Sequence, residues 1–281
     1  MTTTTAAGLA RSCHPGPTLA VTALAALLAF AFTAPPGVAV LLVLCVFTGQ
    51  LVIGWSNDVL DAARDRHDGR HDKPLATGQV SRLAALAALA IAGGVCLVSS
   101  LALGWEPGVV HLVGLVGSGL AYNLGAKATA ASFVPYAVAF GSLPAVVWLA
   151  THPPEMGAGA TLPPLWMVVV GALLGVAAHL LNALPDLSQD LGHGIRGLPH
   201  RLGPSRTRRL APLLMLAAMV TSVVGVGGVT QWWGWAVVTL GAGLAVLASR
   251  GRGAVPFRAA VAMALLTASL LVLTSRLVGA G

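Results

Sequence analysis

Apolar residues run along most of this chain in long stretches, which short segments rich in glycine, proline or charge interrupt. A helix that crosses the hydrocarbon core of a membrane needs about 20 mostly apolar residues, and such helices tolerate internal glycine and proline. Nine stretches of that kind can be drawn: 17–34, 37–55, 80–103, 107–125, 131–150, 164–182, 210–228, 231–249 and 255–277. The pattern predicts an all-α integral membrane protein with about nine transmembrane helices. We expect one domain over residues 1–281, with a flexible cytoplasmic N-terminus at 1–16.

Charged residues are rare in this sequence. They make up 9% of the 281 residues, and hydrophobic residues make up 56%, whereas a soluble globular domain carries about 25% charged residues. This composition argues against a soluble enzyme, a disordered chain and a simple nucleic-acid-binding protein. The three cysteines, Cys13, Cys45 and Cys96, show no metal-binding spacing, so we expect small buried side chains and no disulfide framework.

The basic residues indicate how the predicted helices are oriented. With nine alternating spans, fifteen of the sixteen Lys and Arg residues fall on one side, and only Arg276 falls on the other. Cytoplasmic loops of membrane proteins carry an excess of Lys and Arg. We therefore expect a multi-pass protein of the cell (inner) membrane with its N-terminus in the cytoplasm and its C-terminus outside. Six of the seven tryptophans map to the outer interface, where an aromatic belt is expected. The net charge of +7 is then mainly a topology signal and does not indicate nucleic-acid binding.

The first apolar stretch has one alternative interpretation. Arg11, the apolar run and the small residues near Ala34 are also typical of a secretory signal peptide. We favour a transmembrane helix, because the run is at the long end for a signal peptide and no soluble domain follows it.

The acidic residues are clustered in two places on the predicted cytoplasmic side. Seven of the nine acids lie there, and they are Asp58, Asp61, Asp65, Asp68, Asp72, Asp186 and Asp190. Both segments contain the pattern Asn-x3-Asp-x3-Asp, because positions 57, 61 and 65 recur at 182, 186 and 190, an offset of 125. We term 57–65 the first motif and 182–190 the second motif. On a helix, a spacing of four places the three side chains on one face, one turn apart.

This repeated pattern points to a metal site. Carboxylates at this spacing repel one another, so a cation should compensate them. Oxygen ligands without His or Cys suit a hard cation, and Mg²⁺ in particular binds through one or two carboxylates together with substrate phosphates. The two motifs therefore predict Mg²⁺ ions around a diphosphate. The alternative is that the acids are solvated loop residues, but a random scatter would not repeat the spacing.

Further polar residues near the motifs are candidates for contact with a diphosphate. The basic ones are Arg64, Arg70, Lys73, Lys127 and Arg196. A cation beside a leaving diphosphate neutralises its charge, although each of these residues could instead serve only to orient the protein. His179 and Asn123 lie within predicted spans, and an ionisable residue such as His179 is a functional candidate there by default.

The motifs resemble those of the UbiA superfamily of intramembrane prenyltransferases. The first match is Asn57-Asp58-x2-Asp61-x3-Asp65, followed by Lys73-Pro74-Leu75, where the family often has Arg-Pro-Leu. The second match is Asp186-x3-Asp190-x3-Gly194, followed by Leu198 and Leu202-Gly203. Nine spans, with the motifs after the second and the sixth, are also similar to that family, and the resemblance covers nearly the whole chain.

The resemblance implies a UbiA-like bundle of about nine helices around a central cavity, with the two motifs facing each other over its cytoplasmic mouth. It also implies a Mg²⁺-dependent prenyltransferase that ionises an isoprenyl diphosphate. The prenyl group would pass to an aromatic or other lipophilic acceptor, with release of diphosphate.

The resemblance assigns roles residue by residue. The metal-binding positions are Asn57, Asp58, Asp61, Asp65, Asp186 and Asp190. The catalytic positions are Asp61, Asp65, Asp186, Asp190, Tyr122 and Lys127; the last two are similar to a family Tyr/Lys element whose spacing is one residue shorter. We expect substrate contacts at Asn57, Arg64, Arg70, Lys73, Asn123, His179, Asn182 and Arg196. Asn182 stands where some members have an acid, and Gly197 stands where many have Thr. These differences leave the identity of the acceptor undetermined.

Two other functions fit parts of the sequence. A UbiA-type membrane terpene cyclase would use the same ionisation and let the cation attack its own alkene. A cation-coupled transporter would use the carboxylates to bind its coupling ion. Transporters often have inverted repeats with broken helices at the membrane midplane, whereas these motifs lie at the cytoplasmic ends of spans and repeat in the same orientation. We therefore favour the transferase.

Overall fold

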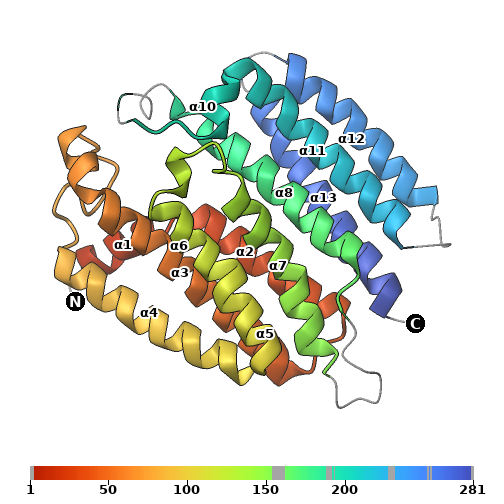
Figure 1. The fold of residues 1–281 in the computed structure, drawn as a ribbon, viewed down its shortest axis with the longest axis horizontal. Helices are drawn as coiled ribbons and strands as arrows, with labels where there is room; N and C mark the ends of the chain where they lie inside the picture. Colours follow the sequence, from red (N-terminus) through yellow and green to blue (C-terminus); the bar gives the residue numbers. More distant parts are fainter. Residues whose placement is uncertain are drawn as a thin grey trace.

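The computed structural model describes residues 3–153, 162–187, 192, 194–226, 232–251, 253 and 255–279. Within these residues all regular secondary structure is helical, and the long helices run side by side in one bundle (Figure 1). The first half contains α1 (Thr3–Ser12), α2 (Pro15–Ala31), α3 (Pro36–His67), α4 (Arg82–Ala102), α5 (Trp105–Val109), the π-helix η1 (Val110–Gly117) and α6 (Ser118–Asn123). The second half contains the 3₁₀ turn η2 (Ala126–Ala128), α7 (Val134–Thr151), α8 (Leu165–Ala183), α10 (Leu198–Leu202), α11 (Pro204–Gly225), α12 (Trp232–Arg250) and α13 (Val255–Gly279).

The predicted all-α membrane architecture is confirmed, but the number of spans is not. Seven described helices are long and apolar enough to cross a membrane, and the bent pair α1–α2 would be an eighth. The predicted span at 107–125 coincides with α5, η1 and α6, which follow one another from Trp105 to Asn123 without a break. No one of these three pieces reaches the length of a span. The count of nine therefore stays a prediction.

Among the described helices, α3 is the longest, and it carries the first motif beyond its apolar part. Its 32 residues correspond to about 48 Å at 1.5 Å per residue, which exceeds the roughly 30 Å thickness of a hydrocarbon core. The apolar part fills the first portion of the helix, and the last three turns carry Asn57, Asp61 and Asp65. The three side chains therefore share one helix, as the spacing predicts.

The second motif is not built in the same way. Helix α8 ends at Ala183, and the chain then turns, with Leu184 N bonded to Leu181 O and Asp186 N bonded to Ala183 O. Pro185 explains this end, because proline lacks an N–H and its ring clashes with the preceding helical turn. Asn182 thus lies in the last turn of α8 and Asp186 just beyond it, so the expected single helical face stops at the proline.

Two glycines one turn apart bring α8 very close to α7. A Cβ atom added at Gly171 would collide with Phe140 O, and one added at Gly175 would collide with Tyr136 O. Small residues at this spacing let two membrane helices pack backbone against backbone. This contact sets the distance between the α7 and α8 residues that face the bundle interior.

The N-terminal segment forms a packed helix where we expected a flexible end. Leu9 of α1 is buried, and its carbonyl accepts a hydrogen bond from Trp55 Nε1 of α3 at 2.9 Å. Arg11 donates to Asp72 O at 3.1 Å. These contacts hold α1 against α3 and against the connection between α3 and α4.

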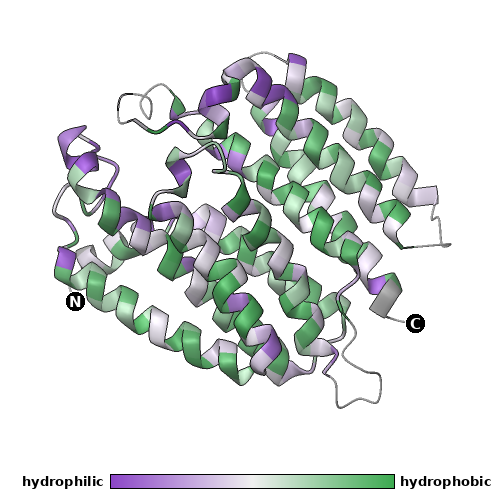
Figure 2. Ribbon diagram, in the orientation of Figure 1, coloured by the Kyte–Doolittle hydropathy of each residue, from purple (hydrophilic) through white to green (hydrophobic). Residues whose placement is uncertain are grey.

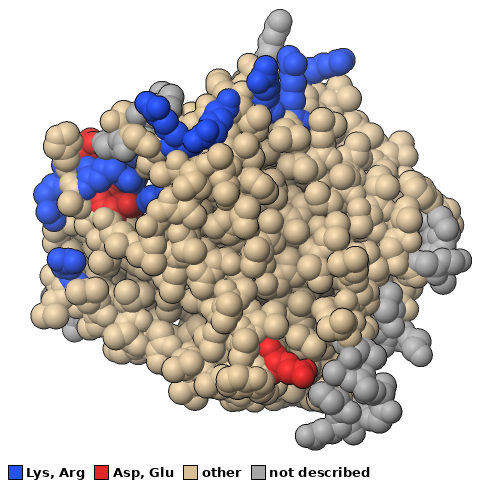
Figure 3. All heavy atoms as spheres, viewed as in Figure 1, with Lys and Arg blue, Asp and Glu red and all other residues tan. Residues whose placement is uncertain are grey.

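Polar residues gather at one end of the bundle. Figure 2 shows hydrophilic residues at the upper left, around α10 and the connection from α3 to α4, and mostly hydrophobic residues along the helices. On the face shown in Figure 3, Lys and Arg side chains lie along the upper and left edges. The C-terminal end of α13 lies at the opposite end of the bundle (Figure 1). Both motifs begin at the polar end.

Candidate active site

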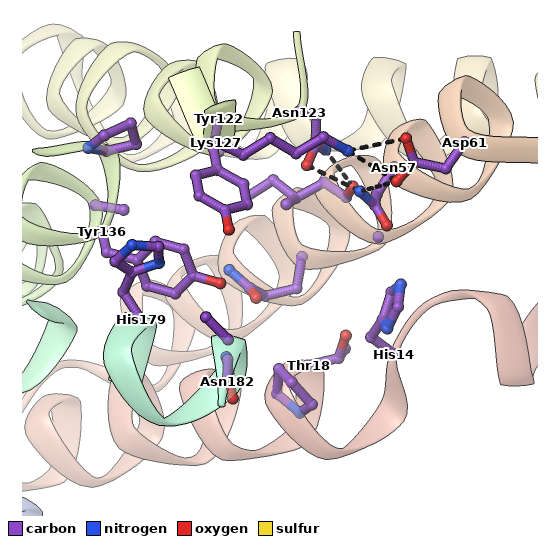
Figure 4. A pocket seen from close by; sticks show the side chains of 18 of the residues that line it. His14, Thr18, Asn57, Asp61, Tyr122, Asn123, Lys127, Tyr136, His179 and Asn182 are labelled. Carbon is purple, nitrogen blue, oxygen red and sulfur yellow. Dashed lines mark hydrogen bonds and ion pairs between the residues drawn. The ribbon is translucent and has the colours of Figure 1, made fainter. Parts of the chain in front are cut away.

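A cavity of about 430 Å³ lies between α2, α3, α6, α7 and α8. Residues of both motifs reach it, because Asn57 and Asp61 line it from α3 and Asn182 lines it from the last turn of α8 (Figure 4). Asp186, just beyond α8, also lines it. Its remaining walls include the apolar side chains of Val21, Ile53 and Phe140. The cavity therefore combines a charged end with an apolar interior.

Most of the residues predicted for the site do line this cavity. Nine of them do so: Asn57, Asp61, Arg64, Tyr122, Asn123, Lys127, His179, Asn182 and Asp186. They are far apart in the sequence, and the fold brings them together. The predicted Asp190 lies outside the described residues.

Asp61 is the centre of the charged end. Its Oδ1 and Oδ2 atoms accept hydrogen bonds from Lys127 Nζ at 2.9 and 2.8 Å, and Oδ2 also pairs with Arg64 Nη2 at 2.7 Å. Asn57 Nδ2 donates to the same oxygen at 3.1 Å. One carboxylate thus holds two cations at the cavity wall.

Asn123 fixes α6 against α3 beside this group. Its Nδ2 donates to Ile53 O and to Ser56 Oγ, both at 2.9 Å, and its Oδ1 accepts from Asn57 Nδ2 at 3.4 Å. The side chain is 7% exposed. Its hydrogen bonds orient the Asn57 amide, which in turn contacts Asp61.

Three rings form an aromatic cluster in the cavity wall. The Tyr122 and Tyr136 centroids are 5.1 Å apart in an edge-to-face arrangement, and His179 lies 5.0 Å from Tyr136 and 5.7 Å from Tyr122. Such arrangements suit aromatic pairs. The cluster presents electron-rich ring faces beside the charged end.

Ser132 connects three parts of the site. Its Oγ lies 2.9 Å from His179 Nε2 and accepts the Leu198 N–H at 2.8 Å. A Cβ atom added at Gly197 would lie 2.6 Å from Lys127 O and 2.8 Å from Ser132 Oγ. Glycine at this position therefore lets the segment after the second motif pack against the turn that carries Lys127, and threonine would not fit without movement.

Five predicted site residues do not line the cavity. They are Asp58, Asp65, Arg70, Lys73 and Arg196. Arg70 donates to both oxygens of Asp72 at 2.9 Å, and these hydrogen bonds lower the pKa of Asp72 to about 2. Lys73 Nζ donates to Asp58 Oδ1 at 2.7 Å. These two cations have carboxylate partners outside the cavity.

The donor set of the two motifs fits a hard cation in its chemistry. Carboxylate and amide oxygens are the ligands that Mg²⁺ prefers. Asp65 is 6% exposed, and its carboxylate receives no hydrogen bond from the described residues, so a cation could bind its oxygens. Within the described part of the chain, however, no three His, Cys, Asp or Glu residues lie close enough to hold a metal ion. The second motif is described only as far as Asp186 and Leu187.

Five polar residues of the cavity were not predicted as site residues from the sequence. They are His14, Thr18, Gln50, Tyr136 and His200. Tyr136 and Gln50 are polar groups within apolar stretches, and Tyr136 is one of only two tyrosines in the chain, so intramembrane polarity is a signal that could have found them. His14 and Thr18 precede or begin an apolar stretch and carry no such signal.

Comparisons with known proteins agree with this geometry. The model of the UbiA prenyltransferase family matches residues 18–267. A UbiA homolog from Aeropyrum pernix K1 is similar in structure with a TM-score of 0.70 at 18% identity, covering 94% of this chain and 97% of that one. A digeranylgeranylglyceryl phosphate synthase has a TM-score of 0.69 at 16% identity, covering 98% of both chains.

A third solved structure carries ligands. It is a UbiA homolog from Archaeoglobus fulgidus bound to GPP and Mg²⁺, with a TM-score of 0.61 at 16% identity, covering 95% of this chain and 98% of that one. At these identities the likeness establishes the fold. No curated protein sequence matches the chain.

Proposed function

We propose, from the premise that this chain belongs to the UbiA prenyltransferase family, that it is a Mg²⁺-dependent membrane prenyltransferase. It would ionise an isoprenyl diphosphate and transfer the prenyl group to an aromatic or other lipophilic acceptor. The observation that carries this proposal is one cavity whose lining combines the charged side chains of Asp61, Asp186, Lys127 and Arg64 with apolar and aromatic side chains. Such a cavity suits a molecule with an anionic head and a hydrocarbon tail.

The cavity residues support each part of the reaction. The allylic carbon–oxygen bond breaks, and its electron pair leaves with diphosphate, whose charge Lys127 and Arg64 can neutralise. The faces of Tyr122 and Tyr136 can stabilise the positive charge left on the allylic carbons. The acceptor then forms a bond to that carbon and loses a proton to water or to the released diphosphate. The apolar walls limit water, which would otherwise capture the cation.

The metal would be held by the oxygens of the two motifs. Asn57, Asp61 and Asp65 would contribute from α3, and Asp186 and Asp190 from the second motif. Mg²⁺ bound there would act as a Lewis acid on the diphosphate oxygens. The A. fulgidus homolog bound to GPP and Mg²⁺ supports this assignment.

We further propose that the polar end of the bundle faces the cytoplasm. The protein would be a multi-pass component of the cell (inner) membrane, with its N-terminus in the cytoplasm, its C-terminus outside and its site opening inward. The gathering of Lys and Arg at that end supports this orientation (Figure 3).

The test uses the purified full-length protein in lipid nanodiscs with radiolabelled GPP. We expect Mg²⁺-dependent release of diphosphate, loss of that release with EDTA, and a prenylated product when phenols, quinols or lipid alcohols are added. Cyclic hydrocarbon formed without any acceptor would replace the transferase by a terpene cyclase. No consumption of prenyl diphosphates of five to twenty carbons would contradict the proposal, and cation-coupled solute flux in vesicles would favour a transporter.

A further inference from the structure

We propose that Asp58 is a positioning residue that fastens His14 into the cavity wall, and that it does not bind the metal. This inference rests on the proposed function and revises the metal assignment that the motif resemblance gave to Asp58. It also adds His14, which lies before the first long helix, to the residues that shape the substrate site.

Asp58 points away from the cavity into a buried contact. Its side chain is 2% exposed, and the residue does not line the cavity, whereas its neighbours Asn57 and Asp61 do. One residue along a helix corresponds to a turn of about 100°. The first motif therefore has a face with Asn57 and Asp61 toward the cavity, and Asp58 lies on another face.

One oxygen of Asp58 is already used twice. Oδ1 accepts from Lys73 Nζ at 2.7 Å and lies 3.1 Å from His14 Nε2. The other oxygen, Oδ2, is buried and has no hydrogen-bond partner among the described residues. Asp58 thus joins three segments: α3, the connection after it through Lys73, and the corner between α1 and α2 through His14.

His14 needs such a fastening because its backbone is strained. It precedes α2 with φ 54° and ψ 68°, a left-handed conformation that non-glycine residues adopt at a cost. No side-chain hydrogen bond caps α2. The ring instead reaches Asp58, and in Figure 4 His14 points from α2 toward the side of α3 that carries Asn57.

The corner around His14 is closely packed and forms part of the cavity wall. Cys13, His14 and Thr18 all line the cavity. A Cβ atom added at Gly54 would lie 2.6 Å from Cys13 O, so the corner touches the backbone of α3. Thr18 Oγ1 donates to Cys13 O at 2.7 Å. If the Asp58–His14 contact is lost, this wall should loosen beside Asn57 and Asp61.

The first experiment separates a positioning residue from a metal ligand by two substitutions of Asp58. Asp58→Asn keeps an oxygen that accepts from Lys73 and His14, and its amide group replaces an oxygen that has no partner. Asp58→Ala removes both contacts. With GPP as substrate, we expect the Mg²⁺ half-saturation of both variants to stay within about twofold of the wild type, and Asp58→Ala alone to raise the KM for GPP severalfold.

Asp61→Asn is the matched comparison for metal binding. Since loss of even an outer-shell partner costs a metal site about tenfold or more, we expect Asp61→Asn to raise the Mg²⁺ half-saturation by at least that factor. If Asp58→Asn raises it equally, Asp58 is a ligand and the proposal is overturned.

A second readout needs no activity. Cys13 is 7% exposed, while Cys45 and Cys96 are buried within helices. In metal-free protein, we expect a thiol reagent to modify Cys13 faster in Asp58→Ala and in His14→Gly, which permits the backbone conformation but lacks the ring. His14→Gln, whose amide can donate to Asp58, should restore the slow rate, and Asp58→Asn should keep it.

These outcomes distinguish the two proposals. If no transferase activity exists, the Cys13 rates still test the fastening. If Asp58→Ala fails to fold, the pair His14→Gly and His14→Gln still gives the comparison. Equal Cys13 rates in the wild type and in His14→Gly would overturn the proposed role of Asp58.

Discussion

Asp61 is the residue at which the charged groups of the cavity meet. Lys127, Arg64 and Asn57 all contact its carboxylate, and each comes from a different turn or segment. A carboxylate that pairs with two cations keeps both of them at the cavity wall, because opposite charges attract. Its chemistry therefore affects both the metal and the groups that would neutralise a diphosphate.

We expect Asp61→Asn to lower turnover of GPP roughly a thousandfold, which corresponds to about 4 kcal/mol of transition-state stabilisation. The substitution keeps the shape of the side chain but removes the charge that attracts metal, Lys127 and Arg64. Initial rates at saturating Mg²⁺ measure the effect.

Asp72→Asn is the control for this change. Asp72 is 61% exposed and pairs with Arg70 outside the cavity, and exposed ion pairs contribute little to stability. Its turnover should stay within about twofold of the wild type. Wild-type rates in Asp61→Asn would refute the central role of this carboxylate.

At the scale of elements, the geometry of the site depends on how closely α8 approaches α7. A Cβ atom added at Gly175 would collide with Tyr136 O and Phe140 Cβ. His179, which lines the cavity, lies one turn further along α8. A side chain at Gly175 would push apart two helices that both contribute to the cavity. The substrate wall is therefore sensitive to a residue that does not touch the substrate.

We expect Gly175→Ala to destabilise the protein by about 1–3 kcal/mol, as overpacking in a close contact does, and to lower turnover. Thermal unfolding in detergent and GPP turnover measure the two effects. Gly93→Ala is the matched control, because an added Cβ on α4 there meets no atom within 4 Å. Alanine in an open helical position is neutral or mildly stabilising, so equal melting temperatures for the two variants would contradict this packing argument.

The two motifs show what the sequence could and could not predict. The first motif has no helix breaker between Asn57 and Asp65, so the helical face predicted from its spacing appears in α3. The second motif has the same spacing, but Pro185 ends α8 before Asp186. The proline was a local signal in the sequence that the periodic pattern obscured.

The orientation of Asp58 could not be predicted from the sequence. Its carboxylate is a chemically suitable metal ligand, but the side chain makes a buried contact instead, and that contact depends on partners that are distant in sequence. His14, 44 residues before Asp58, could be found only in the folded chain.

For the whole molecule, the proposed orientation in the membrane rests on the distribution of charge. The connection between α3 and α4 carries Arg70 and Lys73 and lies at the polar end, whereas Glu106 begins α5 after α4 has crossed the bundle. Positively charged loops are retained in the cytoplasm during insertion. Both motifs would then receive prenyl diphosphate and Mg²⁺ from the cytoplasm.

Thiol labelling in intact cells tests this orientation. His71 and Glu106 are both exposed, and they lie in the segments before and after α4. The three native cysteines are buried, so background labelling should be low. We expect a membrane-impermeant maleimide to label Glu106→Cys in intact cells and His71→Cys only after permeabilisation. The reverse pattern would place both motifs outside. Labelling of both positions in intact cells would mean that α4 does not cross the membrane, and the alternation of spans on which the orientation depends would then be wrong.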